Sequence, residues 1–453
     1  MTELRLTLYR AAWVLPVASA PIRDGAVLVA ADGTIAAVGP TAAIGVVEGA
    51  EVVDLGEAAL MPGLVNVHAH PELALFRGGL DDLAFRDWIL RLVGAKRAAL
   101  VDADYDVAAR WTMVEALRAG ITTLACTEMS AAAVGAMAEA GVRGLVYREV
   151  FGPDPAQVDG SMADLRSAVD VLRSAETDLV RIGISPHAPY TVSDGLFRAS
   201  AGYALAEGLP VAIHAAESAV ETDLVTRGEG DFAPGLRARG IDTPVRGTST
   251  IEMLDRLGVL KTRPLLIHCV RLSADDISRL ADSGSSVAHC PVANARLGHG
   301  TAPYVELREA GIEVGLGTDS VGSNNRLDLL EEARIASILH RARLGSHDYM
   351  PASDLLRLAT LDGARVLGLD ARIGTLEPGK DADLCAVSLA APHVRPVHDP
   401  VSAVFHAARG SDVVLATVRG RVLQRGGEVL TLDAAALAPQ VDEAAVRLAR
   451  ALP

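Results

Sequence analysis

The sequence contains very little lysine and no dense run of basic residues. Its only lysines are Lys96, Lys261 and Lys380, so arginine carries nearly all of the positive charge. Over 453 residues, 57 acidic side chains outnumber 42 basic ones, and the formal net charge is -15. Phosphate binding needs clustered positive charge, so this balance argues against a nucleic-acid surface. We expect a small-molecule partner instead.

Long hydrophobic runs are also missing. Hydrophobic residues make up 50% of the chain, yet no stretch approaches the roughly 20 apolar residues that span a bilayer. Near the start, Pro16 and Pro21 break the one short apolar stretch, which is unlike a secretory signal. The cysteines have neither metal-site spacing nor the density of a disulfide scaffold, as is usual in a reducing compartment. We therefore expect no membrane association and a cytoplasmic location.

From residue 58 onward, short apolar runs alternate with amphipathic stretches of helical spacing, a pattern that predicts a parallel sheet covered by helices. The candidate strands are LMPGLVNVHAH, ITTLACTEM, VRGLVYREVFG, VRIGISPHAPY, LPVAIHAAES, PLLIHCVRLS, SSVAHCPVAN and IEVGLGTDS. Eight strand-helix units make a TIM barrel. We predict an α/β chain in which residues 58–374 form a (β/α)8 barrel.

The two ends of the chain have a different pattern. Residues 1–57 and 375–430 alternate apolar and polar side chains between glycine-containing turns, which is typical of antiparallel strands. We predict that both ends together build one small β-sandwich domain. Residues 431–453 have helical spacing interrupted by Pro439, and we expect them to form a helix that packs on the rest.

Ionisable side chains gather where the predicted barrel strands end. His68 and His70 are two residues apart on one strand and therefore point to the same face. Other members of the set follow later strands: His187, His214, Glu217, His268, His289 and Asp319. Active sites of barrels lie at these strand ends, and so many buried ionisable groups would be costly without a shared purpose. Imidazoles with a carboxylate suit Zn²⁺ or Fe²⁺ and leave a position for water.

Six segments in order resemble the amidohydrolase superfamily, in its branch of cytosine, guanine, adenosine-type and S-adenosylhomocysteine deaminases and triazine hydrolases. They are MPGLVNVHAH, HAAES, IHC, HCPVANARLG, GLGTDSVGSNN and GTLEPGKDADL, and the resemblance covers nearly the whole chain. The resemblance implies that His68, His70, His214 and Asp319 are the metal ligands. It further implies that His268 orients the attacking water and that Glu217 shuttles protons.

Relatives with two metals bridge them through a carboxylated lysine on a barrel strand. None of the three lysines of this chain fits that place, because Lys96 falls in a helical stretch, Lys261 in a loop and Lys380 in a turn of the small domain. We therefore expect a single divalent metal, zinc or alternatively iron.

The implied reaction is hydrolytic deamination of an aminated heterocycle. The metal lowers the pKa of its water towards ~7, with Asp319 and His268 accepting or orienting the proton. Glu217 then protonates a ring nitrogen and the leaving amine, work typically worth about 100- to 10,000-fold in rate. Ammonia leaves and the ring keeps an oxo group. Triazine chlorohydrolases often lack a glutamate in this register, so its presence favours deamination.

The choice of substrate rests on the segments HPELALFRGGLDDLAFRDWI, SPHAPYTVS and HAAESAVETDLVTRGEGDF, which look most like aminodeoxyfutalosine deaminases of menaquinone biosynthesis. Deaminases of S-adenosylhomocysteine, methylthioadenosine, adenosine, guanine or cytosine are the alternatives. The candidate substrate-binding residues are Glu72, Arg77, Trp88, Arg148 and His187. For Arg77 and Arg148, pairing with a substrate carboxylate and a purely structural role are equally good interpretations.

Two further functions compete with deamination. The same site could hydrolyse a cyclic amide or a halogenated triazine, or the chain could be a barrel-shaped scaffold without catalysis. A scaffold would be expected to have lost a ligand or its acid-base group, and here all of these positions are filled. We interpret His289 as a wall residue, and His299 and His340 as ordinary surface or packing residues. A homodimer is the default assembly.

Overall fold

The computed structural model describes residues 5–452 and contains eight parallel strands in two four-stranded sheets. The first sheet has the order β6 (Leu64–Ala69), β7 (Ile121–Glu128), β8 (Arg143–Val150), β9 (Val180–Pro186); the second has β10 (Ala212–Ala215), β11 (Leu265–His268), β12 (Ser286–His289), β13 (Val314–Leu316). Parallel bridges join Ile184 to Val211 and Ala69 to Asp319, so the two sheets meet at both edges. The predicted (β/α)8 barrel is thus confirmed.

Small and branched side chains fill the inside of the barrel. Val65 and Val67 of β6 pack there with Leu145 and Tyr147 of β8 and with Ile267 of β11. These residues are two apart on their strands, as inward-facing positions must be. Alternate residues such as Val146 of β8 and Leu266 of β11 join a larger core beneath the helices.

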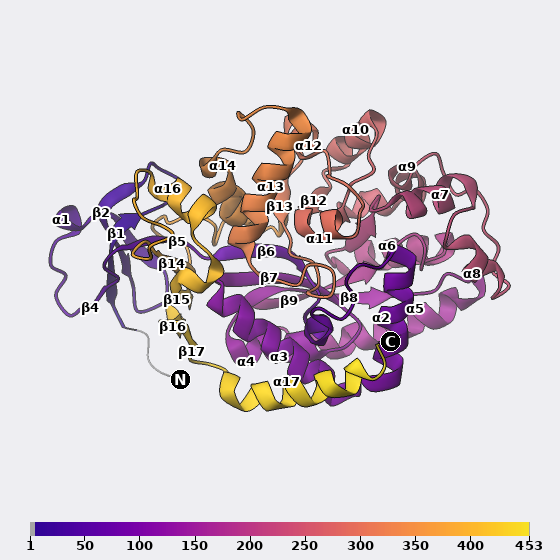
Figure 1. Ribbon diagram of the computed structural model, residues 1–453, viewed down its shortest axis with the longest axis horizontal. Helices are drawn as coiled ribbons and strands as arrows, with labels where there is room; N and C mark the ends of the chain where they lie inside the picture. The colour runs from indigo at the N-terminus through magenta and orange to yellow at the C-terminus, as the bar shows by residue number, and fades with distance from the viewer. Residues whose placement is uncertain (1–4, 453) are drawn as a thin grey trace.

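Helices follow the strands around the outside (Figure 1). The longer ones are α2 (Phe85–Ala99), α3 (Asp102–Arg118), α4 (Ala132–Ala140), α5 (Val158–Arg173), α6 (Asp194–Glu207), α7 (Ala219–Arg227), α10 (Ala274–Ser283) and α13 (Leu329–Leu344). Shorter ones are α8 (Ala233–Arg237), α9 (Thr250–Arg256), α11 (Pro291–Arg296), α12 (Tyr304–Glu309), α14 (Ala352–Arg357) and α15 (Gly363–Val366). Side-chain caps fix several starts: Ser273 accepts from the Asp276 amide before α10, and Asp328 accepts from the amides that open α13.

Strands from both ends of the chain form one nine-stranded sheet at the left of Figure 1. Its early members are β1 (Thr7–Val14), β2 (Ile22–Val29), β3 (Ile35–Pro40), β4 (Glu51–Asp54) and β5 (Ala58–Pro62); its late members are β14 (Leu384–Ser388), β15 (Val413–Val418), β16 (Arg421–Arg425) and β17 (Glu428–Val429). The two ends meet where β5 pairs antiparallel with β14. Strands from both ends of the chain therefore share one sheet, which we call the small β domain.

The passage from this sheet into the barrel lies at Gly63, later than the residue 58 expected from sequence. The apolar run LMPGLVNVHAH hides the change because β5 and β6 are both fully buried. A side chain at Gly63 would come within 2.0 Å of Thr122 Oγ1, so only glycine fits this close crossing.

A buried ion-pair network ties the barrel to the small domain. Arg143 of β8 is almost completely buried, and its Nε and Nη2 donate to Asp383 and Asp381 at 2.8 and 2.7 Å. Arg372 and Arg419 also contact Asp381. The network links barrel and small domain through charges that compensate one another.

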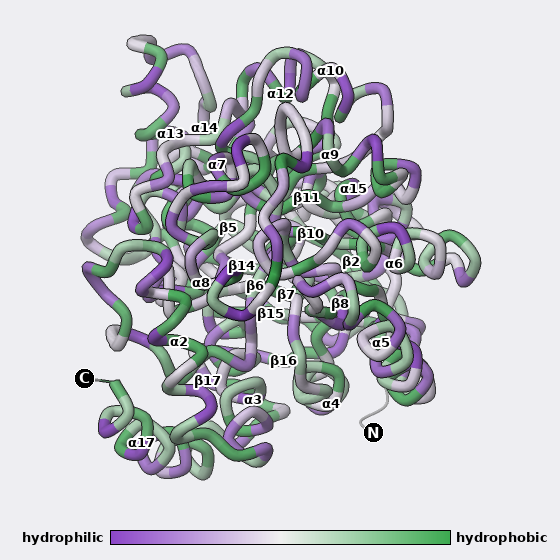
Figure 2. The backbone as a smooth tube through the Cα atoms, turned by 90° about the vertical axis from the view of Figure 1, so that its right-hand side faces the viewer, coloured by the Kyte–Doolittle hydropathy of each residue, from purple (hydrophilic) through white to green (hydrophobic). Residues whose placement is uncertain are grey.

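The C-terminal helix α17 (Ala434–Ala449) lies along the edge of the molecule beside α3, as Figures 1 and 2 both show. Pro439 falls inside this helix without ending it, and Ala444 and Leu448 are buried against neighbouring helices. Among the described residues, no helix is long and apolar enough to cross a membrane.

Candidate metal centre

Three histidines from two barrel strands converge at one end of the barrel. His68 and His70 come from the end of β6, and His214 comes from β10 on the other four-stranded sheet. One nitrogen from each ring lies within 4.8 Å of the others. Burial is the main cause that lowers the pKa of all three, to about 3 for His214. The rings are therefore neutral at pH 7, as metal-binding imidazoles must be.

Asp319 adds a carboxylate to this group. Its Oδ1 lies 3.4 Å from Nε2 of His68 and 3.5 Å from Nε2 of His70. The amide of Ser320 and the hydroxyl of Ser323 donate to its two oxygens, which fixes the orientation of the carboxylate. Burial alone would raise the pKa of Asp319, but the contact with His68 and the neighbouring histidines hold it well below its usual range. Asp319 is thus an anion at neutral pH.

These residues fit a divalent metal. Nε2 of His68 is buried and has no hydrogen-bond partner among the described residues. Nδ1 of His214 donates to the carbonyl of His187 at 3.2 Å, which leaves Nε2 of His214 free as a ligand. Three imidazole nitrogens and one carboxylate oxygen are a donor set that Zn²⁺ and Fe²⁺ both accept. The structure brings together all four ligands implied by the resemblance.

Glu217 lies beside this group, between two histidines. Its Oε1 is 3.6 Å from Nε2 of His268 and 3.3 Å from Nε2 of His299. Nδ1 of His268 donates to Oδ1 of Asn294 at 2.9 Å, so its Nε2 presents a lone pair towards the site. Burial would raise the pKa of Glu217, yet His268 and His299 together lower it. The carboxylate is therefore charged and able to accept a proton.

His299 was expected to be an ordinary surface or packing residue, and the structure places it inside, beside Glu217. Its side chain is buried, it contacts Glu217, and the ring of Phe85 meets it edge-on at 4.6 Å. His299 lies after α11, in the connection that follows β12. The connections at this end of the barrel surround the site. The signal that could have identified it was its place in the segment HCPVANARLGHG, directly after the motif of strand seven.

Strained backbone marks the ends of the strands that build the site. Residues Ala216, His268, Cys269 and Asp319 have φ of 51°, 76°, 49° and 59°. Such left-handed conformations are unfavourable for side chains other than glycine and persist only where the surroundings impose them. Asp319 is held this way by the hydrogen bond from its amide to the carbonyl of His68 at 3.0 Å.

Two of the predicted substrate-binding residues lie beside the centre. The ring of His187 is 4.8 Å from that of His214, and Nδ1 of His187 contacts Thr191 Oγ1 at 2.8 Å. Trp88 donates from Nε1 to the carbonyl of Gly322 at 3.2 Å and lies alongside Phe85, which contacts His299. Trp88 therefore supports the wall that carries His299.

Two of the other three, Glu72 and Arg77, pair with residues outside the histidine group. Glu72 is buried and accepts from Lys96 Nζ at 2.5 Å and from the Ser130 amide at 3.1 Å. Arg77 pairs with Glu115 of α3. Arg148 precedes Glu149 on β8, and consecutive strand residues point to opposite faces.

Glu149, the neighbour of Arg148 on β8, lies beside the site. Oε1 of Glu149 lies 4.0 Å from Nε2 of His187, and ligand atoms of Glu149, His187 and His214 lie within 4.8 Å of one another. Burial and the neighbouring Glu72 raise the pKa of Glu149 to about 8. No motif points to Glu149, because the direction of its side chain depends on the register of β8.

His289, expected as a wall residue, belongs to a second histidine pair. Its Nε2 lies 3.1 Å from Nε2 of His340, both side chains are buried, and Tyr304 packs against them. This pair lies between β12 and α13, where it contributes to packing.

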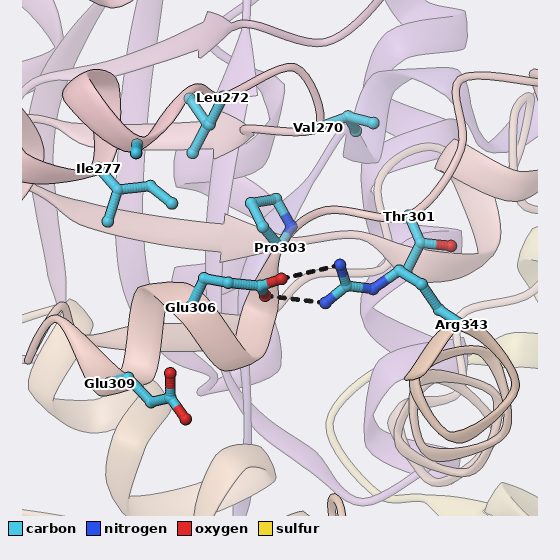
Figure 3. A pocket seen from close by; sticks show the side chains of 9 residues that line it. Val270, Leu272, Ile277, Thr301, Pro303, Glu306, Glu309 and Arg343 are labelled. Atoms are coloured by element: carbon cyan, nitrogen blue, oxygen red, sulfur yellow. Dashed lines mark hydrogen bonds and ion pairs between the residues drawn. The ribbon is translucent and has the colours of Figure 1, made fainter. Parts of the chain in front are cut away.

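A surface hollow of about 520 Å³ lies outside the histidine group (Figure 3). Glu306 and Arg343 form a bidentate ion pair within it, at 2.9 and 2.8 Å. Val270 and Thr301 line it, but none of the ligand or acid-base groups does. The chemistry therefore belongs to the histidine group, and the hollow only flanks it.

Comparison with known proteins agrees with this geometry. A 5-methylthioadenosine/S-adenosylhomocysteine deaminase of Moorella thermoacetica is 35% identical over 433 residues, which cover 94% of this chain and 96% of the relative. A zinc-bound crystal structure of an adenosine deaminase from Xanthomonas campestris superposes with a TM-score of 0.87 at 31% identity, over 98% of this chain and 99% of that one. A zinc-bound atrazine chlorohydrolase from Arthrobacter aurescens shares the fold, with a TM-score of 0.82 at 23% identity over 97% and 100% of the two chains.

Barrel, small β domain and buried histidine-aspartate group together define a hydrolase of the metal-binding barrel class. The model of the amidohydrolase family matches residues 59–423. The chain belongs to the amidohydrolase family and is a hydrolase of carbon-nitrogen bonds other than peptide bonds.

Proposed function

We propose that this protein deaminates the adenine ring of a nucleoside by hydrolysis, and releases ammonia. The observation that carries the proposal is the position of Glu217, buried between His268 and His299 beside the three ligand histidines. An amine on an aromatic ring is a poor leaving group, so its hydrolysis needs a group that first accepts and then returns protons. Glu217 is the carboxylate suited to that work.

The residues divide the reaction between them. A divalent ion held by His68, His70, His214 and Asp319 supplies Lewis acidity, which makes water nucleophilic near neutral pH. His268 accepts a hydrogen bond from the attacking water at Nε2, because Nδ1 is committed to Asn294. Zinc is the proposed metal, in line with the zinc-bound adenosine deaminase, and iron is the alternative.

Glu217 then carries protons in two steps. It takes a proton from the attacking water and delivers it to the ring nitrogen next to the attacked carbon. It next takes the proton of the new hydroxyl group on the attacked carbon and passes it to the departing amine, so that water and the aminated ring become the oxo ring and ammonia. Its lowered pKa supports this order, because the first step needs the carboxylate form.

The relatives support adenine nucleosides as the substrate class. The Moorella thermoacetica and Xanthomonas campestris proteins are named after substrates that all contain adenine and ribose. These substrates differ in the group on the 5′ carbon. Aminodeoxyfutalosine, the substrate we expected from the sequence, belongs to the same class, and a role in menaquinone biosynthesis would follow from it. The atrazine chlorohydrolase shares only the fold.

An ammonia-release assay of metal-reconstituted protein tests the proposal. The panel contains aminodeoxyfutalosine, S-adenosylhomocysteine, methylthioadenosine and adenosine, with guanine, cytosine, a cyclic amide and atrazine for the rival reactions. We expect ammonia from at least one adenine nucleoside. Turnover of only a rival compound, or silence across the panel with metal bound, would reject the proposal.

A further inference from the structure

Glu149 is the buried acidic group near the metal centre that the reaction above leaves without a task. Its side chain is 6% exposed, and its Oε1 is buried without a hydrogen-bond partner among the described residues. A buried carboxylate without donors is costly, so such a group is expected to receive them from a ligand. Burial and Glu72 disfavour its charge, while Lys96 and Arg148 favour it.

Its neighbour His187 also presents an acceptor. The hydroxyl of Thr191 donates to the carbonyl of Ala188 at 3.2 Å, so Nδ1 of His187 donates to that hydroxyl at 2.8 Å. With Nδ1 as the donor, Nε2 of the neutral ring carries a lone pair and no proton. Oε1 of Glu149 and Nε2 of His187 lie 4.0 Å apart, too far for a hydrogen bond to each other, so both are open to a ligand.

A second metal is the first candidate for this place, since Glu149, His187 and His214 lie close enough to hold one. His214, however, has one available lone pair. Its Nδ1 donates to the His187 carbonyl, and its Nε2 already belongs to the group with His68 and His70. Glu149 and His187 alone would be a poor set for a cation.

The remaining occupant is a ligand group that carries hydrogen-bond donors. The acid-base groups Glu217 and His268 come from β10 and β11, whereas Glu149 and His187 come from β8 and β9. A molecule that reaches both sides needs an aminated ring at one end and donor groups at the other. A vicinal diol supplies two hydroxyl donors side by side.

We propose that Glu149 is a specificity-determining residue that accepts hydrogen bonds from the ribose hydroxyls of the nucleoside, with His187 as the second acceptor. This inference rests on the proposed function and deepens it. It assigns the sugar to β8 and β9 and the reacting ring to β10 and β11. It also explains why a carboxylate is kept in a place where burial opposes its charge.

The test compares adenosine with 2′,3′-dideoxyadenosine as substrates of the zinc-loaded enzyme. Leaving a buried hydrogen-bonding group without its partner costs about 10- to 100-fold, so wild-type kcat/KM should fall by that factor without the diol. Glu149→Gln should reduce kcat/KM for adenosine by a similar factor, mostly through KM, and should leave the value for dideoxyadenosine nearly unchanged. Glu149→Asp, which keeps the carboxyl group but shortens the side chain, should retain part of the preference.

Glu128→Gln is the matched control. Glu128 is also a buried glutamate at the end of a neighbouring strand, but its carboxylate accepts from Ala133 and Ser130 and serves no group of the site. This variant should keep the full preference for the diol. Zinc content of every variant, measured by mass spectrometry, should stay at one ion per chain.

Several results would overturn the inference while the proposed function stands. They are equal wild-type turnover of both nucleosides, an equal loss on both in Glu149→Gln, or two bound zinc ions per chain with the second lost in that variant. If the wild type released ammonia from no nucleoside, the proposed function would fail and this inference with it.

Discussion

Replacing Glu217 with glutamine removes the proton carrier while keeping its size. The carboxylate oxygen of Glu217 lies 3.6 Å from Nε2 of His268 and 3.3 Å from Nε2 of His299. The amide oxygen of glutamine can occupy the same position, so the site should keep its shape. Glutamine cannot accept and return a proton. General acid-base catalysis contributes about 100- to 10,000-fold, or about 3 to 5 kcal/mol of the activation barrier.

We therefore expect kcat of Glu217→Gln to fall by about 100- to 10,000-fold, with KM and metal content nearly unchanged because Glu217 is not among the ligands. Steady-state ammonia release and metal analysis measure the three quantities. Glu207→Gln is the control, since Glu207 pairs with Arg173 on the outer surface. A variant that kept its metal and lost less than about tenfold would refute the assigned role.

Three further perturbations test other parts of the structure. His299→Asn should raise the pKa of Glu217, because His299 now lowers it, and the acid limb of the kcat/KM profile should move to higher pH; an unmoved limb would show that His299 does not act on Glu217. Arg143→Met should lower the free energy of unfolding by about 3 to 5 kcal/mol, since it leaves Asp381 and Asp383 without a compensating charge. Denaturant unfolding measures this change, and a loss of less than about 1 kcal/mol would contradict the network. Chelation should abolish ammonia release and lower the unfolding temperature, and added zinc should restore both; full activity in metal-free protein would exclude the metal centre.

The barrel and the ligand group follow from the sequence because both depend on local rules. Strands with apolar runs alternate with helices, and polar side chains end the strands. His68 and His70 share a face whatever the rest of the fold does, since two residues separate them on one strand. His214 and Asp319 could be placed with them because parallel strands in a barrel end at the same rim.

The parts that escaped prediction depend on contacts that no local pattern shows. Arg148 and Glu149 are neighbours in sequence, and a one-residue change of register would exchange the faces that they occupy. The sequence suggested Glu72 as a substrate-binding residue. In the structure its carboxylate accepts a hydrogen bond from Lys96 of the following helix. His299 lies in a loop, where neither a period of two nor of 3.6 applies.

The most direct test of the central claim is the reaction of adenosine in ¹⁸O-labelled water, followed by mass spectrometry of the products. The proposed chemistry predicts one ammonia for each nucleoside consumed and one labelled oxygen in the purine ring, with the sugar still attached. Free adenine, label in the sugar, or consumption of adenosine without ammonia would contradict ring deamination.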